Sequence, residues 1–216
     1  MLPVETGAAG FLRCRSERTP EGACVTVCGG IENINGQWYV FYHRCTNNTD
    51  YSRQACAEPI TILPDGTIPQ VEITTQGMDG KPIRATGTIP AAYACNLTTG
   101  KKMKLGLGKP QTQPRITETG GEVYVADMAD RTDVGYKYFE FQKVTGLRVA
   151  YRGNGRGALE VRAEDILLGS ILIIPSENWT ASEETIAFPI GVHTLYLRYR
   201  GAGTLDLLEL EFQTER

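Results

Sequence analysis

From residue 122 to residue 212 the sequence is a succession of short segments in which apolar and polar residues alternate. The alternation is clearest in Gly146–Arg152 and Thr194–Arg200, and glycine-rich turns such as Gly153-Asn-Gly155 separate the segments. No stretch keeps the 3.6-residue period of an amphipathic helix. Evenly spaced short strands are typical of a β-sandwich or barrel, so we predict an all-β fold. The strands predicted after residue 91 are Met103–Leu107, Glu122–Met128, Tyr136–Phe141, Gly146–Arg152, Ala158–Ala163, Leu172–Pro175, Thr185–Phe188, Gly191–Arg200 and Leu205–Phe212.

The first part of the chain also predicts β-structure. Asn35-Gly36 separates two apolar runs, and this dipeptide supplies the two positive-φ positions of a tight hairpin turn. We therefore predict a hairpin over residues 30–43. A third strand is predicted over Arg53–Leu63 and a short one over Val71–Thr75, with a turn at Pro64-Asp-Gly66 between them.

Charge and hydropathy exclude two classes of partner. The chain has 216 residues and a net charge of −3, with the two signs interspersed, so no basic face is expected for nucleic acid. The longest apolar run, Ile166–Pro175, is too short to cross a membrane. The first residues lack the basic and apolar regions of a signal peptide, which favours a cytoplasmic location.

Six cysteines all lie before residue 96, at positions 14, 24, 28, 45, 56 and 95. None forms a Cys-x-x-Cys pair, so free thiols are the first interpretation, with a disulfide or a metal site as alternatives. A cysteine nucleophile would need a histidine base, and only His43 and His193 are present. Neither histidine stands in a recognisable catalytic context.

Two segments resemble known families. Gly29–Arg44, Tyr51–Ile60 and Pro69–Gly77 together resemble the last propeller blade of glycoside hydrolase family 43, in its xylosidase and arabinofuranosidase members. Residues 92–216 resemble a family 6 carbohydrate-binding module, a jelly-roll β-sandwich. The resemblance rests on Gly157–Arg162, on Asn178-Trp179, on Gly191–Gly201 and on Leu205-Asp-Leu207.

The resemblance implies four parts: an irregular segment 1–28, a blade remnant 29–78, a linker 79–91 and a sandwich 92–216. Hydrolysis in such enzymes needs two carboxylates on either side of the glycosidic bond, and the blades that carry them are not recognisable here. Glu21 is interpreted as a solvated loop residue, and Cys28 stands where the family places a histidine. We therefore assign no catalytic residue. The chain is expected to be the C-terminal piece of a truncated or split glycosidase, inactive alone.

A sugar site needs an aromatic plate and a few convergent polar groups. The resemblance to the binding module implies that Trp179 is the aromatic residue that stacks on the sugar, and we expect it to lie in a polar loop. The alternative is a structural role, in which Trp179 closes the end of the sandwich. Asp206 falls where the family has an asparagine, and Tyr136 is the candidate for the second aromatic ring, with a core position as the alternative. Arg53 and His43 are candidates for a residual propeller pocket.

The expected ligand is a xylan- or arabinoxylan-type oligosaccharide or polysaccharide. No cofactor is expected. Calcium occurs in this module family, but the acidic residues that would bind it are replaced by Pro90–Ala94. Two further hypotheses stay open. The chain could dock on a separate chain carrying the missing blades, or on a second copy of itself, and it could be a decayed module that binds nothing.

Overall fold

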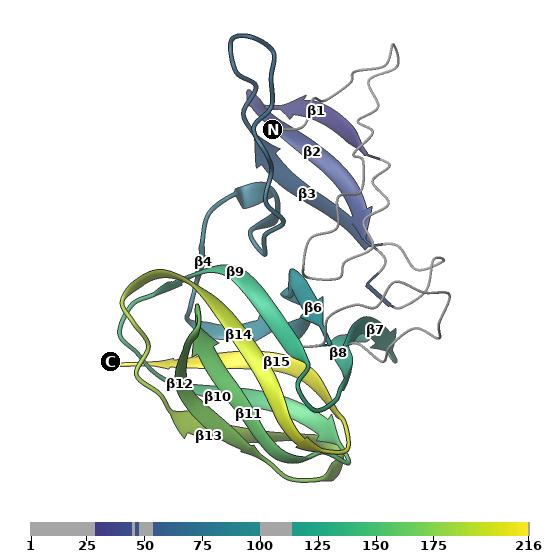
Figure 1. The fold of residues 1–216 in the computed structure, drawn as a ribbon, viewed down its shortest axis with the longest axis vertical. Coiled ribbons are helices and arrows are strands. Elements are labelled where there is room, and N and C mark those ends of the chain that lie inside the picture. The colour runs from purple at the N-terminus through teal and green to yellow at the C-terminus, as the bar shows by residue number, and fades with distance from the viewer. Residues whose placement is uncertain (1–28, 45, 48–53, 100–113, 216) are drawn as a thin grey trace.

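The fold is described from a computed structural model over residues 29–44, 46–47, 54–99 and 114–215. These residues form three β-sheets and, among them, two single 3₁₀ turns are the helical elements, η1 (Gly77–Asp79) and η2 (Ala91–Tyr93). A small sheet lies at one end of the molecule and a two-sheet sandwich at the other (Figure 1). The all-β prediction, with a sandwich preceded by a smaller sheet, is confirmed.

The small sheet is an antiparallel meander of β1 (Gly30–Ile34), β2 (Gln37–Arg44) and β3 (Gln54–Ile60). The predicted hairpin turn joins β1 to β2: Asn35 and Gly36 have φ values of 54° and 88°. The side chain of Asn33 closes the turn, because its Oδ1 accepts a hydrogen bond from the Gly36 N–H at 3.0 Å.

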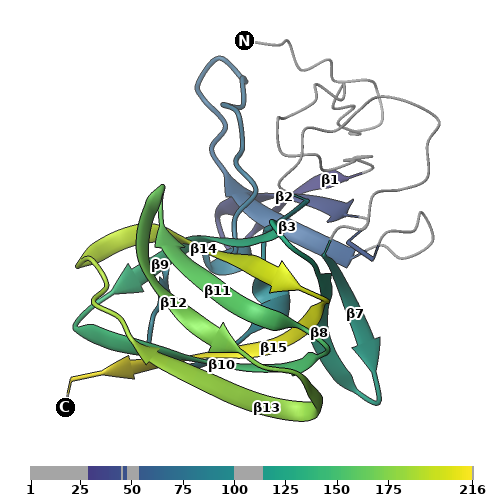
Figure 2. The ribbon, with the colours of Figure 1, turned by 60° about the horizontal axis from the view of Figure 1, so that its bottom comes forward.

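Each sheet of the sandwich has a central path of five strands and one additional short strand. The first sheet has the order β13-β10-β15-β8-β7, with β5 paired to β15, and the second has the order β12-β11-β14-β9-β4, with β6 paired to β9 (Figure 2). The strands of the first sheet are β5 (Gly87–Pro90), β7 (Arg115–Thr119), β8 (Glu122–Met128), β10 (Val144–Gly153), β13 (Ser176–Thr185) and β15 (Leu205–Thr214). Those of the second are β4 (Ile83–Arg84), β6 (Asn96–Thr98), β9 (Asp133–Phe141), β11 (Arg156–Ala163), β12 (Ile166–Ile173) and β14 (Gly191–Ala202).

The core lies between these two sheets and follows the two-residue period of the strands. On β14, Leu195, Leu197 and Tyr199 are fully buried, while Arg198 between them points outward and pairs with Asp133 through two bonds of 2.7 and 2.8 Å. Burying one large apolar side chain contributes about 1.5–3 kcal/mol. The inward residues therefore hold the sandwich together and leave the outward face of each sheet free for other roles.

Several predicted boundaries differ from the structure, and the strand predicted at Leu172–Pro175 lies earlier, as β12. Residues 79–91, predicted as a linker, contribute β4, β5 and η2 to the sandwich, because Ile83 pairs with Phe139 and Ile89 pairs with Leu210. The segment 71–75 is not a strand, and its Thr74 is hydrogen-bonded to Glu58 of β3. The strand predicted near residue 186 lies earlier, as β13, and the strand predicted at Met103–Leu107 lies outside the described residues.

Polar contacts join the small sheet to the sandwich. Glu72 accepts hydrogen bonds from the Nζ of Lys137 at 2.9 Å and from the hydroxyl of Tyr138 at 2.7 Å. The backbone N–H of Lys137 donates to the hydroxyl of Thr75 at 3.0 Å. The joint therefore ties the segment after β3 to β9.

Candidate functional site

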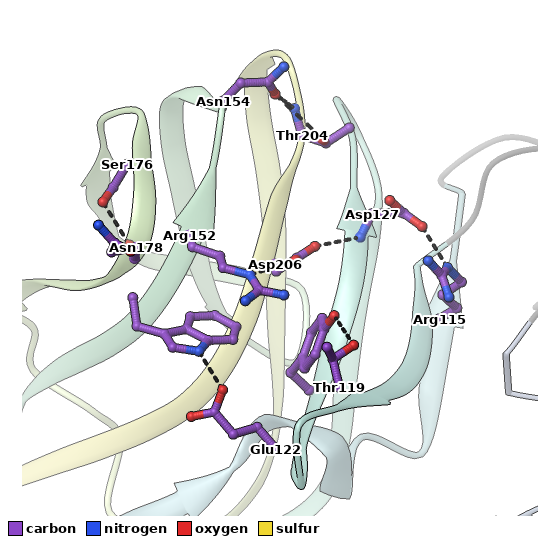
Figure 3. Close-up of polar contacts among 12 residues, drawn as sticks. Arg115, Thr119, Glu122, Asp127, Arg152, Asn154, Ser176, Asn178, Thr204 and Asp206 are labelled. Carbon is purple, nitrogen blue, oxygen red and sulfur yellow. Dashed lines mark hydrogen bonds and ion pairs between the residues drawn. The ribbon is translucent and has the colours of Figure 1, made fainter.

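The outward face of the first sheet carries a row of polar and aromatic side chains from four neighbouring strands (Figure 3). Arg152 on β10 lies directly opposite Asp206 on β15 in the strand register. Trp179 lies on β13, which flanks β10, and Tyr124 and Asp127 lie on β8, which flanks β15. Because cross-strand neighbours on one face are close together, the register alone assembles this row.

Arg152 is the centre of the row. The carbon of its guanidinium lies 4.3 Å from the centre of the Trp179 ring and 4.8 Å from that of Tyr124. The two rings meet edge to face, with centres 5.4 Å apart and planes at 75°. A cation over an aromatic face is stabilised by about 0.5–2 kcal/mol, so the two rings and the guanidinium hold one another in place.

Asp206 holds Arg152 from the other side. Its Oδ2 accepts a hydrogen bond from the Arg152 Nε at 3.1 Å, and its Oδ1 accepts one from the backbone N–H of Asp127 at 3.3 Å. The carboxylate of Asp127 pairs with the Nε of Arg115 at 2.6 Å. Arg115 in turn donates to the side chain of Asn47 at 2.8 Å, so the row extends to the part of the chain that follows β2.

Two further bonds fix the aromatic rings. The indole N–H of Trp179 donates to Glu122 Oε2 at 2.8 Å, and the hydroxyls of Tyr124 and Thr119 lie 3.2 Å apart. Gly120 and Gly121 form the turn that places Thr119 opposite Glu122. Trp179 and Arg152 remain half-buried, so this surface combines an aromatic pair with hydrogen-bond donors and acceptors that water can reach.

The structure brings together Trp179 and Asp206, two of the three residues predicted for the sandwich site. It places Trp179 on a strand and not in a loop, so the site lies on the face of a sheet. Asp206 has both oxygens engaged within the protein, and it acts on the site by positioning Arg152.

Tyr136 does not belong to this site. It is fully buried, and its hydroxyl donates to the carbonyl of Ala91 at 3.0 Å. Burial raises the pKa of this phenol far above its ordinary value. A ring enclosed in this way is not available to a sugar, and Tyr124 takes the position beside Trp179. Sequence reasoning missed Tyr124 because it sits in a strand of mostly core residues; the Gly120-Gly121 turn, which sets its register against β7, is the signal that could have found it.

The residues predicted for a propeller pocket lie elsewhere. His43 is half-buried on β2 in the small sheet, where its Nε2 is buried without a hydrogen-bond partner in the described structure. Arg53 lies outside the described residues. The structure therefore gives no joint geometry for these two candidates.

Two kinds of feature are absent from the described residues, a metal-binding cluster and a membrane-spanning helix. In the parts of the chain that the structure describes, no three His, Cys, Asp or Glu side chains lie close enough to hold a metal ion. Residues 90–94, where the resemblance would place calcium ligands, carry no carboxylate and include the turn η2, of which only Ala91 is buried. No helix in the described residues is long and apolar enough to span a membrane.

The chain is similar in sequence to part of a known protein. No family model matches the chain. A protein named xylosidase/arabinosidase from Thermoclostridium stercorarium is 39% identical over 198 residues, which is 87% of this chain and 42% of that protein. This chain is a homologue of part of that glycosidase. It spans less than half of the relative's length.

Solved structures agree with this homology in their fold. A family 43 arabinoxylan arabinofuranohydrolase from Bacillus subtilis, solved with cellotetraose, matches 87% of this glycosidase homologue and 40% of its own chain, with a TM-score of 0.57 and 15% identity. A family 6 carbohydrate-binding module from Clostridium stercorarium, solved with cellobiose, matches 63% of this chain and 99% of its own, with a TM-score of 0.50 and 17% identity. The fold is thus that of a family 43 segment joined to a family 6 module.

Proposed function

We propose that this glycosidase homologue binds xylan- or arabinoxylan-type oligosaccharides on the outward face of its first sandwich sheet and does not hydrolyse them by itself. One observation carries the proposal: the half-buried ring of Trp179 packs edge to face with the buried ring of Tyr124, and Arg152, Glu122 and Asp206 frame the pair. A saccharide has apolar C–H faces and a rim of hydroxyls, and this combination of rings and charged groups suits both. The name of the homologous protein supports a xylose- or arabinose-containing glycan.

The noncatalytic part of the proposal is supported by Glu58, the most buried carboxylate of the small sheet. It is 3% exposed, and its oxygens accept hydrogen bonds from the Tyr42 hydroxyl at 3.2 Å and from the N–H and hydroxyl of Thr74 at 2.7 and 2.8 Å. A glycosidase carboxylate must reach the substrate. Glu58 faces other protein groups, so its role is structural.

Titration calorimetry with xylotetraose tests the binding site. The chain has two tryptophans, and Trp38 lies in β2 of the small sheet, 40% exposed and away from the proposed site. We expect Trp179→Ala to weaken binding by roughly tenfold or more, since loss of one stacking ring costs about 1–2 kcal/mol. Trp38→Ala is the matched control and should bind like the parent protein.

Three results would contradict the proposal. Unchanged binding by a folded Trp179→Ala protein would place the site elsewhere. A folded parent protein that bound no oligosaccharide on a glycan array would favour a decayed module. Release of sugar from aryl xylosides or arabinofuranosides by the purified chain would refute the noncatalytic assignment.

A second candidate function concerns the small sheet. Within the described residues β1 pairs only with β2, so one edge of this sheet has no neighbour there. An unpaired strand edge is a site for pairing with another chain. Docking onto a chain that supplies more blades, or onto a second copy, would use this edge. Light scattering at high protein concentration tests self-association, and a constant monomeric mass would count against it.

A further inference from the structure

The guanidinium of Arg152 has donors left over for a ligand. Its Nε is used by Asp206 at 3.1 Å. In the described structure no residue accepts a hydrogen bond from its two terminal nitrogens, and the Arg152 side chain is 28% exposed. Four N–H groups of a planar fork are therefore left without an acceptor among the described residues.

The position of Arg152 limits what can bind. Its guanidinium carbon lies close to the centres of both the Trp179 and the Tyr124 rings, at 4.3 and 4.8 Å. A saccharide that binds beside Trp179 and leaves these contacts in place therefore meets the guanidinium as well. An Arg fork pairs most strongly with a carboxylate, through two parallel charge-assisted hydrogen bonds.

The nearby acidic groups leave the terminal nitrogens of Arg152 available. Asp206 is engaged by Arg152 and by the backbone of Asp127, and Asp127 is paired with Arg115. Glu122 is held at the edge of the indole by the Trp179 N–H and forms no ion pair with Arg152. A carboxylate bound to the terminal nitrogens of Arg152 therefore meets one close cation and two opposing carboxylates, Asp206 on the Nε side of the guanidinium and Glu122 at the edge of the indole.

We propose that Arg152 makes this site selective for xylan-type saccharides that carry a uronic acid, over neutral saccharides of the same length. The inference rests on the proposed function, because it assigns the class of sugar to the same site. Asp206 is then a positioning residue, since it orients the guanidinium and does not touch the ligand. Glu122 opposes the selectivity by its charge.

The experiment compares two probes on the full chain by titration calorimetry at low ionic strength: xylotriose, and xylotriose bearing one glucuronosyl substituent. We expect the acidic probe to bind roughly fivefold more tightly, the gain of one partly exposed ion pair. The preference should shrink in high salt, which screens exposed charges. Glu122→Gln should enlarge it.

Variants on one strand separate a specific contact from general attraction. Arg152→Gln should abolish the preference for the acidic probe. Arg148→Gln is the matched control. Arg148 lies four residues before Arg152 on the same face of β10, and it is paired with Glu211 at 2.7 Å. It should retain the preference. If Arg152→Gln fails to fold, Arg152→Lys serves: an ammonium keeps the charge but not the fork, so the preference should fall.

The outcomes distinguish this inference from the proposed function. Equal binding of the two probes by the parent protein would overturn the acid selectivity and leave sugar binding at Trp179 standing. Binding of neither probe would overturn the proposed function itself. Equal loss of preference in Arg148→Gln and Arg152→Gln would overturn the role of Arg152, because it would show a diffuse electrostatic effect.

Discussion

Glu58→Gln should change how the stability of the protein depends on pH. Glu58 is 3% exposed on β3, and none of the ion pairs formed by the described residues includes it. Burial raises the pKa of Glu58, and the charge of Glu72 acts in the same direction, while the hydrogen bonds from Thr74 and Tyr42 oppose the rise. A carboxyl group in this position keeps its proton in the folded protein after the unfolded chain has lost it.

The sign and size of the effect follow from proton linkage. Below the unfolded pKa, about 4.5, both states are protonated and the contribution of Glu58 is fully present. As the pH rises from there to the raised folded pKa, the folded state holds more protons than the unfolded chain, so stability falls. Each unit of upward shift removes about 1.4 kcal/mol of unfolding free energy. A glutamine cannot ionise, and its carbonyl can still accept the bond from the Thr74 N–H.

Urea unfolding of the parent protein and of Glu58→Gln across about pH 4.5 to 8 measures this difference. We expect the free energy of unfolding of Glu58→Gln to increase relative to that of the parent protein as the pH rises. Glu32→Gln, an exposed change on β1, is the control and should run parallel to the parent. Parallel curves for Glu58→Gln as well would refute the reasoning, because Glu58 would then ionise as easily in the folded protein as in the unfolded chain.

Two other substitutions test the site and the core. Asp206→Ala should weaken xylotetraose binding several-fold, because it frees Arg152. Asp206→Asn can still accept a hydrogen bond and should keep part of the affinity. Equal affinity in both variants and the parent would remove Asp206 from the site. Phe139 is fully buried beside Phe141 and Phe212. In urea titration, Phe139→Ala should therefore lower the free energy of unfolding by about 3–5 kcal/mol. A loss below about 1 kcal/mol would mean that the core is not packed as described.

The elements that the sequence predicts well are those with a local signal. Asn35-Gly36 specifies its turn through positive φ values, and the alternation of residues 194–200 specifies which side chains of β14 face the core. The two short strands β4 and β5 have no such signal. They pair with β9 and β15, far along the chain, and their own proline- and glycine-rich composition is typical of a linker.

The site was predicted only in part, because its arrangement also depends on strand pairing that has no local signal in the sequence. The strand register of β9 shifts between Tyr136 and Phe139, so that Tyr136 and Phe139 both face the core although they lie three residues apart. Simple alternation does not show such a shift, so it could not decide between the ligand position that the resemblance suggests for Tyr136 and the core position that was its alternative. Arg152 and Tyr124 come beside Trp179 only through pairing among β13, β10, β15 and β8. No local sequence pattern encodes that arrangement.

The indole N–H signals of the two tryptophans in a nuclear magnetic resonance titration test the central claim most directly. Each tryptophan gives one signal, and a Trp38→Phe variant assigns them. If the saccharide binds beside Trp179, whose indole N–H donates to Glu122 at 2.8 Å, then xylotetraose should shift the Trp179 signal and leave that of Trp38 in place. A shift of the Trp38 signal alone, or of neither signal at saturating ligand, would contradict the assigned binding surface.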